Sequence, residues 1–256
     1  MKFKYYQLIK VVLLSFFVAL QSLQSFAELP ERLIYNMSNI TPSVAFEGEQ
    51  VPTSFKKSNN LAITTGNYYF AEGEPLVVEG VVTDINDIPI QGVSVNMWQT
   101  NAKGFYQFNR SEEDPLVDKN FNDTGGVVTD SLGRFQFLTV FPAGYSQDPA
   151  DLQDDLADGD EGKEVKKVKT KSIKAKRKRS PHINFIIKHG SFKTLETQMF
   201  FSIYSNAEDY YFSKLQKKDR ELLTAKMYYI DSRDKDIGKR AVFNIKLDGV
   251  QRFKYY

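Results

Sequence analysis

The sequence predicts a mainly β protein, built as an antiparallel sandwich or barrel. Short runs rich in Val, Phe and Thr recur beyond Pro75, and Gly, Pro, Asn and Asp residues separate them. Strands at this spacing are typical of antiparallel sandwiches and barrels. The chain has 256 residues, of which 41% are hydrophobic and 14% aromatic, so it can bury one sizeable core or two small ones.

Charge and cysteine content exclude several classes of function. The 34 basic residues nearly balance the 32 acidic ones, so no global field favours a nucleic-acid partner, and none is expected. Cysteine is absent, which excludes disulfides, thiolate catalysis and zinc sites built on cysteine.

Residues 1–27 have the three-part layout of a secretory signal peptide. Lysines among the first ten residues precede an apolar run over Val11–Leu20, and small residues flank Phe26 just before Glu28. The apolar run is shorter than the ~20 residues that span a bilayer, which argues against a membrane anchor. We expect cleavage near Ala27 and export of the protein, to a periplasm or to the exterior.

The remaining chain divides into an arm and one domain. Residues 28–73 show no sustained period and predict an irregular N-terminal arm, whereas residues 74–256 predict the β domain. Residues 131–133 predict a tight hairpin with Gly133 at positive φ, and residues 208–229 have helical spacing and predict one C-terminal helix. The expected strands are Leu76–Thr83, Val93–Thr100, Gly126–Asp130, Arg134–Val140, His182–Lys188, Thr197–Tyr204 and Ala241–Leu247.

A charged low-complexity insert interrupts the domain at residues 148–179. Its first half is dominated by Asp, Glu and Gly, and Lys166–Arg179 is rich in Lys and Arg. Neither half has enough apolar surface to offset the entropy of ordering it, so we expect a solvated, disordered loop. Two interactions are left open for this insert. Lys166–Arg179 could contact a polyanion or an anionic membrane surface, or the two halves could pair with each other.

Two tyrosines and one histidine could converge on a metal ion. Tyr106 follows one expected strand, Tyr145 follows another, and His182 begins a third. A phenol titrates near ~10 and must lose its proton to bind a metal, which a hard trivalent cation promotes. Such a set suggests ferric iron rather than zinc, whose sites favour His and Cys.

Six motifs occur in a fixed order along the chain and raise this hypothesis above chance. They are Trp98–Tyr106, Asp118–Phe121, Thr129–Asp130 with Gly133–Phe137, Pro142–Tyr145, Pro181–Phe185 and Thr197–Phe201, followed by a last strand over Phe243–Gly249. Together they resemble the intradiol ring-cleavage dioxygenases, most closely the protocatechuate 3,4-dioxygenase type. The resemblance extends from about Thr41 to Gly249.

The resemblance implies a β-sandwich around non-haem Fe(III), held by two tyrosines, two histidines and hydroxide. Tyr106, Tyr145 and His182 match three of these ligands, but Asn184 stands where the second histidine is expected. On a strand, His182 and Asn184 share a face, so the amide points toward the lost imidazole's place. Its oxygen could ligate a hard cation, water could fill the position, or the pocket could have lost its metal.

The resemblance also implies further roles. Tyr145 would take one of the two protons that a catecholic substrate loses, and Arg179 would stabilise negative charge on the ring, although Arg179 could equally be one more solvated residue of the insert. Gln198 is either a support for the ligands or a plain strand residue. Trp98 is expected in the core, and Asp118 and Asp130 in turns.

Three functions are compatible with the sequence. The first is an exported ferric dioxygenase that cleaves an aromatic diol with O2 to a muconate-type diacid. The second is a pseudoenzyme whose pocket binds an aromatic ligand or a protein. The third is a surface interaction module acting through the charged insert. The choice between a monomer and a homo-oligomer is open.

Overall fold

The computed structural model describes residues 39–46, 50–147, 177–229 and 238–250. The expected signal peptide lies outside the described residues, as do residues 148–176 of the insert. The strands are β1 Pro75–Thr83, β2 Ser94–Trp98, β3 Thr124–Val128, β4 Arg134–Val140, β5 Tyr145–Gln147, β6 Arg177–Arg179, β7 His182–Lys188, β8 Leu195–Phe201, β9 Thr224–Tyr229, β10 Lys239–Val242 and β11 Ile245–Lys246, and the helices are the short 3-10 turn η2 Phe212–Lys214 and α3 Lys217–Leu222.

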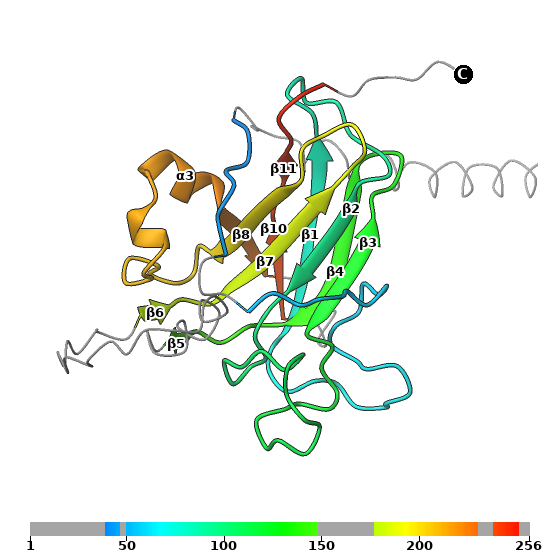
Figure 1. Ribbon diagram of the computed structural model, residues 1–256, viewed down its shortest axis with the longest axis vertical. Helices are drawn as coiled ribbons and strands as arrows, with labels where there is room; N and C mark the ends of the chain where they lie inside the picture. The colour runs from blue at the N-terminus through cyan, green and yellow to red at the C-terminus, as the bar shows by residue number, and fades with distance from the viewer. Residues whose placement is uncertain (1–38, 47–49, 148–176, 230–237, 251–256) are drawn as a thin grey trace, which may run out of the picture. The chain divides into compact units, whose positions relative to one another are not determined.

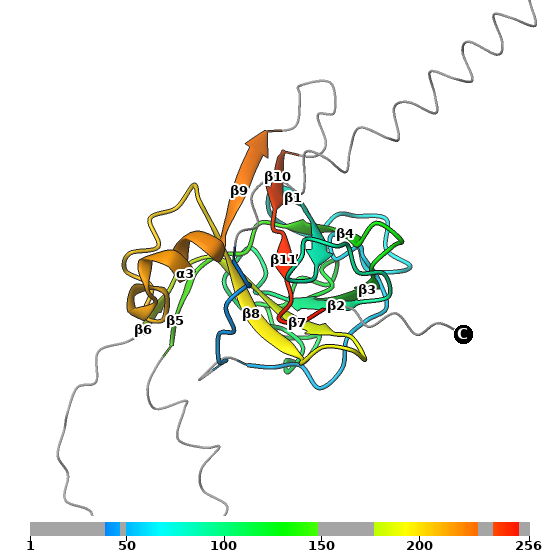
Figure 2. The ribbon, with the colours of Figure 1, turned by 90° about the horizontal axis from the view of Figure 1, so that it is seen from above.

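Nine strands form one sheet that folds into two packed layers (Figure 1). One layer holds β3, β2, β7 and β8, the other holds β4, β1, β10 and β11, and β9 joins them by pairing with both β8 and β10. Figure 2 shows the two layers end-on. Phe135 of β4 meets Phe185 of β7 between the layers, with ring centroids 6.4 Å apart, so the main core lies there. The prediction of a mainly β sandwich is confirmed.

Pairing within the sheet is mixed rather than uniformly antiparallel. β1 runs parallel to β10 and β11, and β8 runs parallel to β9. β1 lies between β4 on one side and β10 and β11 on the other, and both of its faces are buried over most of its length, which explains why its sequence is a nearly continuous apolar run instead of an alternating one.

The expected strands appear with small shifts. The turn expected at residues 131–133 forms, but the prediction that its flanking strands pair as a hairpin is wrong. Gly133 has a φ of +70° and its N–H donates to the Asp130 carbonyl at 2.9 Å, so the turn forms as predicted. Its two flanking strands nevertheless do not pair, because β3 pairs with β2 and β4 pairs with β1. The turn therefore carries the chain from one layer to the other.

The helix expected over residues 208–229 is mostly absent. Only Lys217–Leu222 is α-helical, and Thr224–Tyr229 is strand β9, paired with Lys239–Val242 of β10. Pairing between these strands outweighs the helical spacing of the sequence. The last strand is also divided, because the Asn244 side chain accepts from the Val81 N–H at 3.1 Å where a backbone partner would stand.

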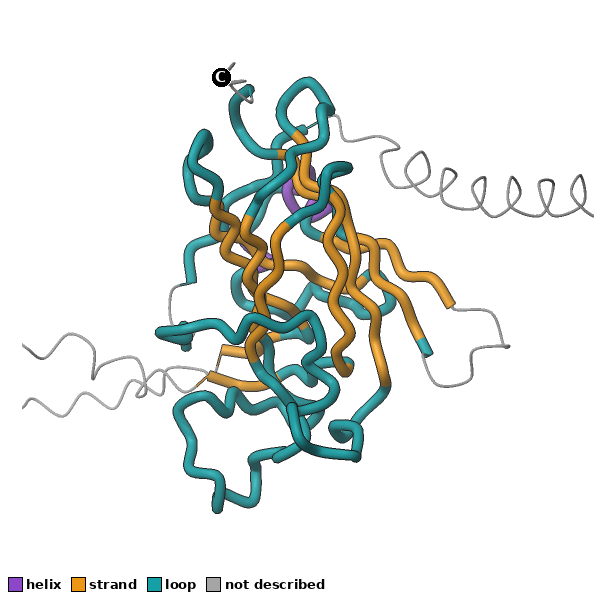
Figure 3. The backbone as a smooth tube through the Cα atoms, turned by 90° about the vertical axis from the view of Figure 1, so that its right-hand side faces the viewer, coloured by secondary structure: helices purple, strands orange, loops and turns teal. Residues whose placement is uncertain are grey.

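The described part of the N-terminal arm, residues 39–46 and 50–73, is irregular and binds to the β sandwich. The Thr41 N–H donates to the Lys246 carbonyl, and the Val44 N–H donates to that of Glu196. Figure 3 shows long loops gathered at one end of the strands. No helix in the described part of the chain is long and apolar enough to cross a membrane.

Candidate metal centre

Strand β7 separates the hydrophobic core from a second buried face. Ile183 and Phe185 point into the main core, whereas His182 and Asn184 alternate with them and point to the other side. All four side chains are buried. Trp98 of β2 and Gln198 of β8 are the cross-strand partners of Asn184, so they flank it on this second face.

The N-terminal arm covers this face with aromatic side chains. The Trp98 ring lies 4.8 Å from that of Phe46 and 5.8 Å from that of Phe55, measured between centroids, and its Nε1–H donates to the Gln50 carbonyl at 2.9 Å. Trp98 is fully buried. It is thus packed inside the protein, as expected, although in the smaller cluster beside the site and not in the main core.

A tight turn after β2 brings Tyr106 over this face. The Asn101 side-chain oxygen accepts from the N–H groups of Lys103 and Phe105, at 3.0 and 3.1 Å, and Gly104 sits between them with a φ of +87°. Glycine adopts this conformation without the steric cost that a Cβ brings. The Tyr106 side chain that follows is 7% exposed.

Two glycines let three site-bearing segments approach backbone to backbone. A Cβ on Gly104 would stand 2.7 Å from the Gly144 carbonyl oxygen, and a Cβ on Gly144 would stand 2.6 Å from the Arg179 carbonyl oxygen. Tyr145 pairs with Arg179 across the β5–β6 ribbon. The turn before Tyr106, the approach to Tyr145 and the segment before His182 are therefore held together.

The three predicted ligands converge at one place. The rings of Tyr106 and Tyr145 have centroids 5.7 Å apart, those of Tyr145 and His182 6.0 Å apart. The two phenols also hydrogen bond to each other. Asn184 joins this group, because its Nδ2 donates to the Tyr106 hydroxyl at 2.8 Å. The structure thus brings together all the residues predicted to bind a metal.

His182 has the tautomer that metal binding requires. Its Nδ1 lies 2.7 Å from the Ser180 carbonyl oxygen, which can only accept, so Nδ1 carries the proton and Nε2 the lone pair. Burial, with the nearby charge of Arg179, lowers the pKa of His182 to about 3. The imidazole is therefore neutral at physiological pH.

Burial shifts the pKa of the two phenols in the opposite direction and likewise favours their neutral form. It raises the pKa of Tyr106 far above its usual value of 10.0, and hydrogen bonds from Tyr145 and Asn184 offset only part of that rise. Burial also raises the pKa of Tyr145, and the adjacent Tyr106 adds to that effect. Both phenols are neutral until a cation in the site compensates the charge of the phenolate.

This donor set fits a hard trivalent cation. No group of three His, Asp or Glu side chains suited to a metal occurs among the described residues, so a metal here depends on the phenols. Two phenol oxygens and one imidazole lone pair suit ferric iron, whose charge stabilises phenolates. Tyr106, Tyr145 and His182 are the side chains that would hold it.

Arg179 is a buried part of the site and not a solvated residue of the insert. It is 1% exposed, ends strand β6, and donates from Nε to Asp209 at 3.1 Å and from Nη2 to Gln198 at 3.1 Å. Its guanidinium carbon lies 4.6 Å from the centroid of the Tyr211 ring. The last three residues of the predicted insert are therefore structured.

Asp209 is a site residue that sequence reasoning missed. It is fully buried, and besides Arg179 it accepts from the backbone N–H groups of Ser180, Tyr211 and Phe212, at 2.7 to 2.9 Å. A fully buried arginine needs such a paired charge. Nothing in the local sequence indicates this role, because Asp209 lies in the stretch expected to be helical.

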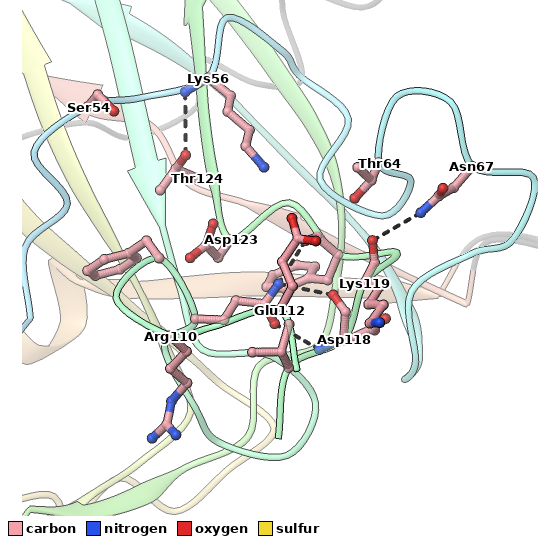
Figure 4. Close-up of a pocket in the computed structure, with 14 residues that line it drawn as sticks. Ser54, Lys56, Thr64, Asn67, Arg110, Glu112, Asp118, Lys119, Asp123 and Thr124 are labelled. Atoms are coloured by element: carbon pink, nitrogen blue, oxygen red, sulfur yellow. Dashed lines mark hydrogen bonds between the residues drawn. The ribbon is translucent and has the colours of Figure 1, made fainter. Parts of the chain in front are cut away.

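A separate cavity of about 550 Å³ opens between the arm and the loop after Tyr106. Figure 4 shows Asp123 and Lys56 on its wall, and none of the residues predicted for the metal centre lines it. Asp118, also on the wall, accepts from the N–H groups of Glu72 and Asn120, which matches its expected place in a turn. Asp130 likewise caps its turn by accepting from the Leu132 N–H.

Comparison with known proteins identifies the family. The model of a family described as Dioxygenase matches residues 54–249, about three quarters of the chain. The chain belongs to the intradiol dioxygenase family. Among curated relatives, the protocatechuate 3,4-dioxygenase beta chain of Burkholderia cepacia is 40% identical over 73 residues, covering 28% of this chain and 31% of the relative. Catechol 1,2-dioxygenase 1 of Acinetobacter lwoffii is 32% identical over 127 residues, covering 48% and 35%. The matches thus span about a third of these relatives' own length.

Solved structures of intradiol dioxygenases show the same fold. Catechol 1,2-dioxygenase from Pseudomonas arvilla C-1 has a TM-score of 0.58 at 21% identity, over 83% of this chain and 63% of that one. The dioxygenase domain of a carbohydrate-binding fusion from Streptomyces sp. SirexAA-E has a TM-score of 0.55 at 20% identity, over 83% and 100%. At this identity the likeness establishes the fold alone.

Proposed function

We propose that the protein is an exported non-haem ferric dioxygenase that cleaves an aromatic ring between two adjacent hydroxyl groups. The convergence of Tyr106, Tyr145 and the neutral imidazole of His182 carries this proposal. The substrate class, an aromatic diol with O2 as the second substrate, follows the names of the catechol and protocatechuate dioxygenase relatives. Export is proposed from the signal-like residues 1–27.

Ferric iron, when bound, acts as a Lewis acid that makes a chelated catecholate reactive toward O2. The chain supplies the rest. The Tyr145 oxygen accepts one of the two protons that the diol loses on binding. Arg179 holds a positive charge beside the site, and its burial with Asp209 keeps that charge oriented in a water-poor place, where it stabilises negative charge developing on the ring.

The aromatic cover gives the substrate ring an apolar wall. Phe108 packs on Tyr106 with centroids 5.7 Å apart, and Trp98, Phe46 and Phe55 extend the same cluster. Such a wall excludes water and favours a flat ring over a flexible polar substrate.

Insertion of both oxygen atoms of O2 between the hydroxylated carbons of the substrate gives a muconate-type diacid.

Iron content and the visible spectrum test the proposal. The protein, purified without chelators and reconstituted with ferric iron, is expected to bind one iron and to show a visible charge-transfer band from tyrosinate to iron. Tyr106→Phe and Tyr145→Phe should each remove much of that band, whereas Tyr69→Phe, at an exposed ring, should not. The intact mass of the exported protein should correspond to a chain beginning at Glu28.

Turnover is tested next, with catechol and protocatechuate and detection of the ring-opened diacid. A red protein that consumes O2 with either diol supports the dioxygenase. A colourless protein that refuses iron contradicts it and leaves the two alternatives, a pseudoenzyme that binds an aromatic ligand or a protein, and a surface interaction module.

A further inference from the structure

Four buried side chains form a continuous hydrogen-bonded chain that ends on Tyr106. Arg179 donates to Gln198 at 3.1 Å, Gln198 donates to Asn184 at 2.8 Å, and Asn184 donates to the Tyr106 hydroxyl at 2.8 Å. Arg179, Asn184 and Gln198 are each at most 1% exposed. Asn184 and Gln198 are directly opposite on β7 and β8, so the sheet register places the two amides in contact.

The direction of this chain is fixed at the arginine. A guanidinium only donates, so the oxygen of the Gln198 amide must face Arg179 and its NH2 group must face Asn184. The Asn184 oxygen must then accept from Gln198, which leaves its NH2 group for Tyr106. Reversing the Asn184 amide would set two buried donors against each other, and buried polar groups left unsatisfied are costly.

Arg179 maintains the orientation of the two amides because its own position is fixed. Its ion pair with Asp209 is buried, with both side chains at 0% exposure, and Asp209 is held by the Ser180 N–H as well. The Tyr211 ring covers the guanidinium. The anchor of the chain is therefore rigid, and the polarity it imposes reaches Tyr106 through two amides.

The direction of this hydrogen-bonded chain decides whether Asn184, which stands where the family has a histidine, can bind a metal. The amide oxygen is the only atom of Asn184 that could ligate a hard cation, and it points to Gln198, whereas the NH2 group, which faces the Tyr106 oxygen, offers no lone pair. We propose that Asn184 is not a metal ligand but a positioning residue, whose NH2 group orients the Tyr106 oxygen in a centre with three protein ligands, Tyr106, Tyr145 and His182.

This inference rests on the proposed function. It predicts an effect of Gln198→Leu on iron binding opposite to the effect expected if Asn184 were a ligand. If Asn184 were a ligand, its oxygen would have to turn from Gln198 toward the metal, and the NH2 groups of Asn184 and Gln198 would then oppose each other. Gln198→Leu would then tighten ferric binding and shift the charge-transfer band to higher energy, because the iron would gain a donor. If Asn184 positions Tyr106, Gln198→Leu releases the amide and weakens the site instead.

The experiment measures ferric affinity by chelator competition, together with the position of the charge-transfer band, for the full chain and its variants. We expect Asn184→Ala and Gln198→Leu each to weaken iron binding about 10-fold or more, the usual effect of losing a partner of a metal ligand. Both should shift the band to lower energy, because the phenolate loses a donor. Tighter binding or a higher-energy band in Gln198→Leu would overturn the proposal.

Thr197→Val is the matched control. Thr197 precedes Gln198 on β8, faces the other side of the sheet, and its hydroxyl donates to the Pro42 carbonyl at 2.8 Å. This variant also loses one hydrogen bond of a buried side chain, but its iron affinity and band should stay unchanged. Gln198→Met, which is equally unable to donate, replaces Gln198→Leu if the latter does not fold.

A measurement on the metal-free protein separates this inference from the proposed function. In protein labelled with ¹⁵N at asparagine, the Asn184 NH2 protons should exchange slowly, and their resonances should move in Tyr106→Phe. Fast exchange and an unchanged resonance would refute the hydrogen-bonded chain even in a protein that binds iron. A protein that shows the protected amide but binds no iron would refute both the proposed function and the three-ligand centre, and would leave Asn184 as a donor to Tyr106 only.

Discussion

At the scale of single residues, Asp123 is a buried carboxyl group on the cavity wall with an incomplete set of hydrogen bonds. It is 5% exposed, and its Oδ2 atom has no hydrogen-bond partner among the described residues. Burial raises the pKa of this carboxyl, while the charge of Lys56 and the nearby backbone N–H groups of Gln107 and Phe108 lower it by less. The folded state therefore binds the Asp123 proton more tightly than the unfolded chain does.

Asp123→Asn is expected to stabilise the protein at pH 7. The folded pKa is raised, so native Asp123 contributes stability below its unfolded pKa and loses it as pH rises through the folded pKa. Removing the buried charge should raise the free energy of unfolding by about 1 kcal/mol at pH 7, with a smaller gain near pH 4. Urea unfolding at both pH values measures this. Asp118→Asn should destabilise instead, because both Asp118 oxygens accept backbone N–H bonds.

Single residues also show how far the sequence could predict the site. Tyr106, Tyr145 and His182 could be named because ordered motifs surround them, and the structure brings them together. Whether Arg179 is buried or solvated could not be decided, since its environment depends on Asp209, thirty positions later. The direction of the Asn184 amide is likewise set by tertiary contacts, so the residue could be found but its role could not.

At the scale of elements, local patterns predicted strands well and their partners poorly. Arg134–Val140 and His182–Lys188 form as expected because their alternation or continuous apolar run reports burial. The turn at Gly133 gave no sign that its strands diverge into different layers. Thr224–Tyr229 could extend either a helix or a sheet, and pairing with β8 and β10 decided it. Partner choice is a long-range property that a local window cannot contain.

Gly104→Ala should disturb two elements at once. The substitution forces a Cβ into positive φ and places it 2.7 Å from the Gly144 carbonyl, so the segments carrying Tyr106 and Tyr145 must separate. We expect a loss of about 2–3 kcal/mol in the free energy of unfolding, measured in urea, and a weaker charge-transfer band. Gly92→Ala is the control, since Gly92 has a φ of +81° with nothing within 4 Å of the added Cβ. A band equally weakened in both variants would refute the role of the contact.

At the scale of the whole molecule, the fold places the site away from the main core. The two layers bury their apolar faces against each other, and the outer face of β2, β7 and β8 is left for the polar side chains of the site. The arm then closes that face through Phe46 and Phe55. Stability and chemistry therefore depend on opposite sides of the same strands, which lets the polar site be buried without opening the core.

The charged insert leaves and re-enters the molecule at one point. Gln147, at the end of β5, is the cross-strand partner of Arg177, at the start of β6, so the two ends of residues 148–176 are neighbours. A four-residue turn can close that distance. Replacing residues 148–176 with such a turn should keep the fold and the metal centre, because no described contact of the site depends on them.

We expect the shortened protein to be more stable by about 1–2 kcal/mol, since each halving of a loop lowers its closure cost by about 0.6 kcal/mol. Urea unfolding, iron content and binding to anionic lipid vesicles would be compared with the full chain. Unchanged iron binding with lost vesicle binding would assign Lys166–Lys176 to an anionic surface and the dioxygenase chemistry to the sandwich. Loss of iron would contradict this division, since β5 and β6 would then need the insert to position Tyr145 and Arg179.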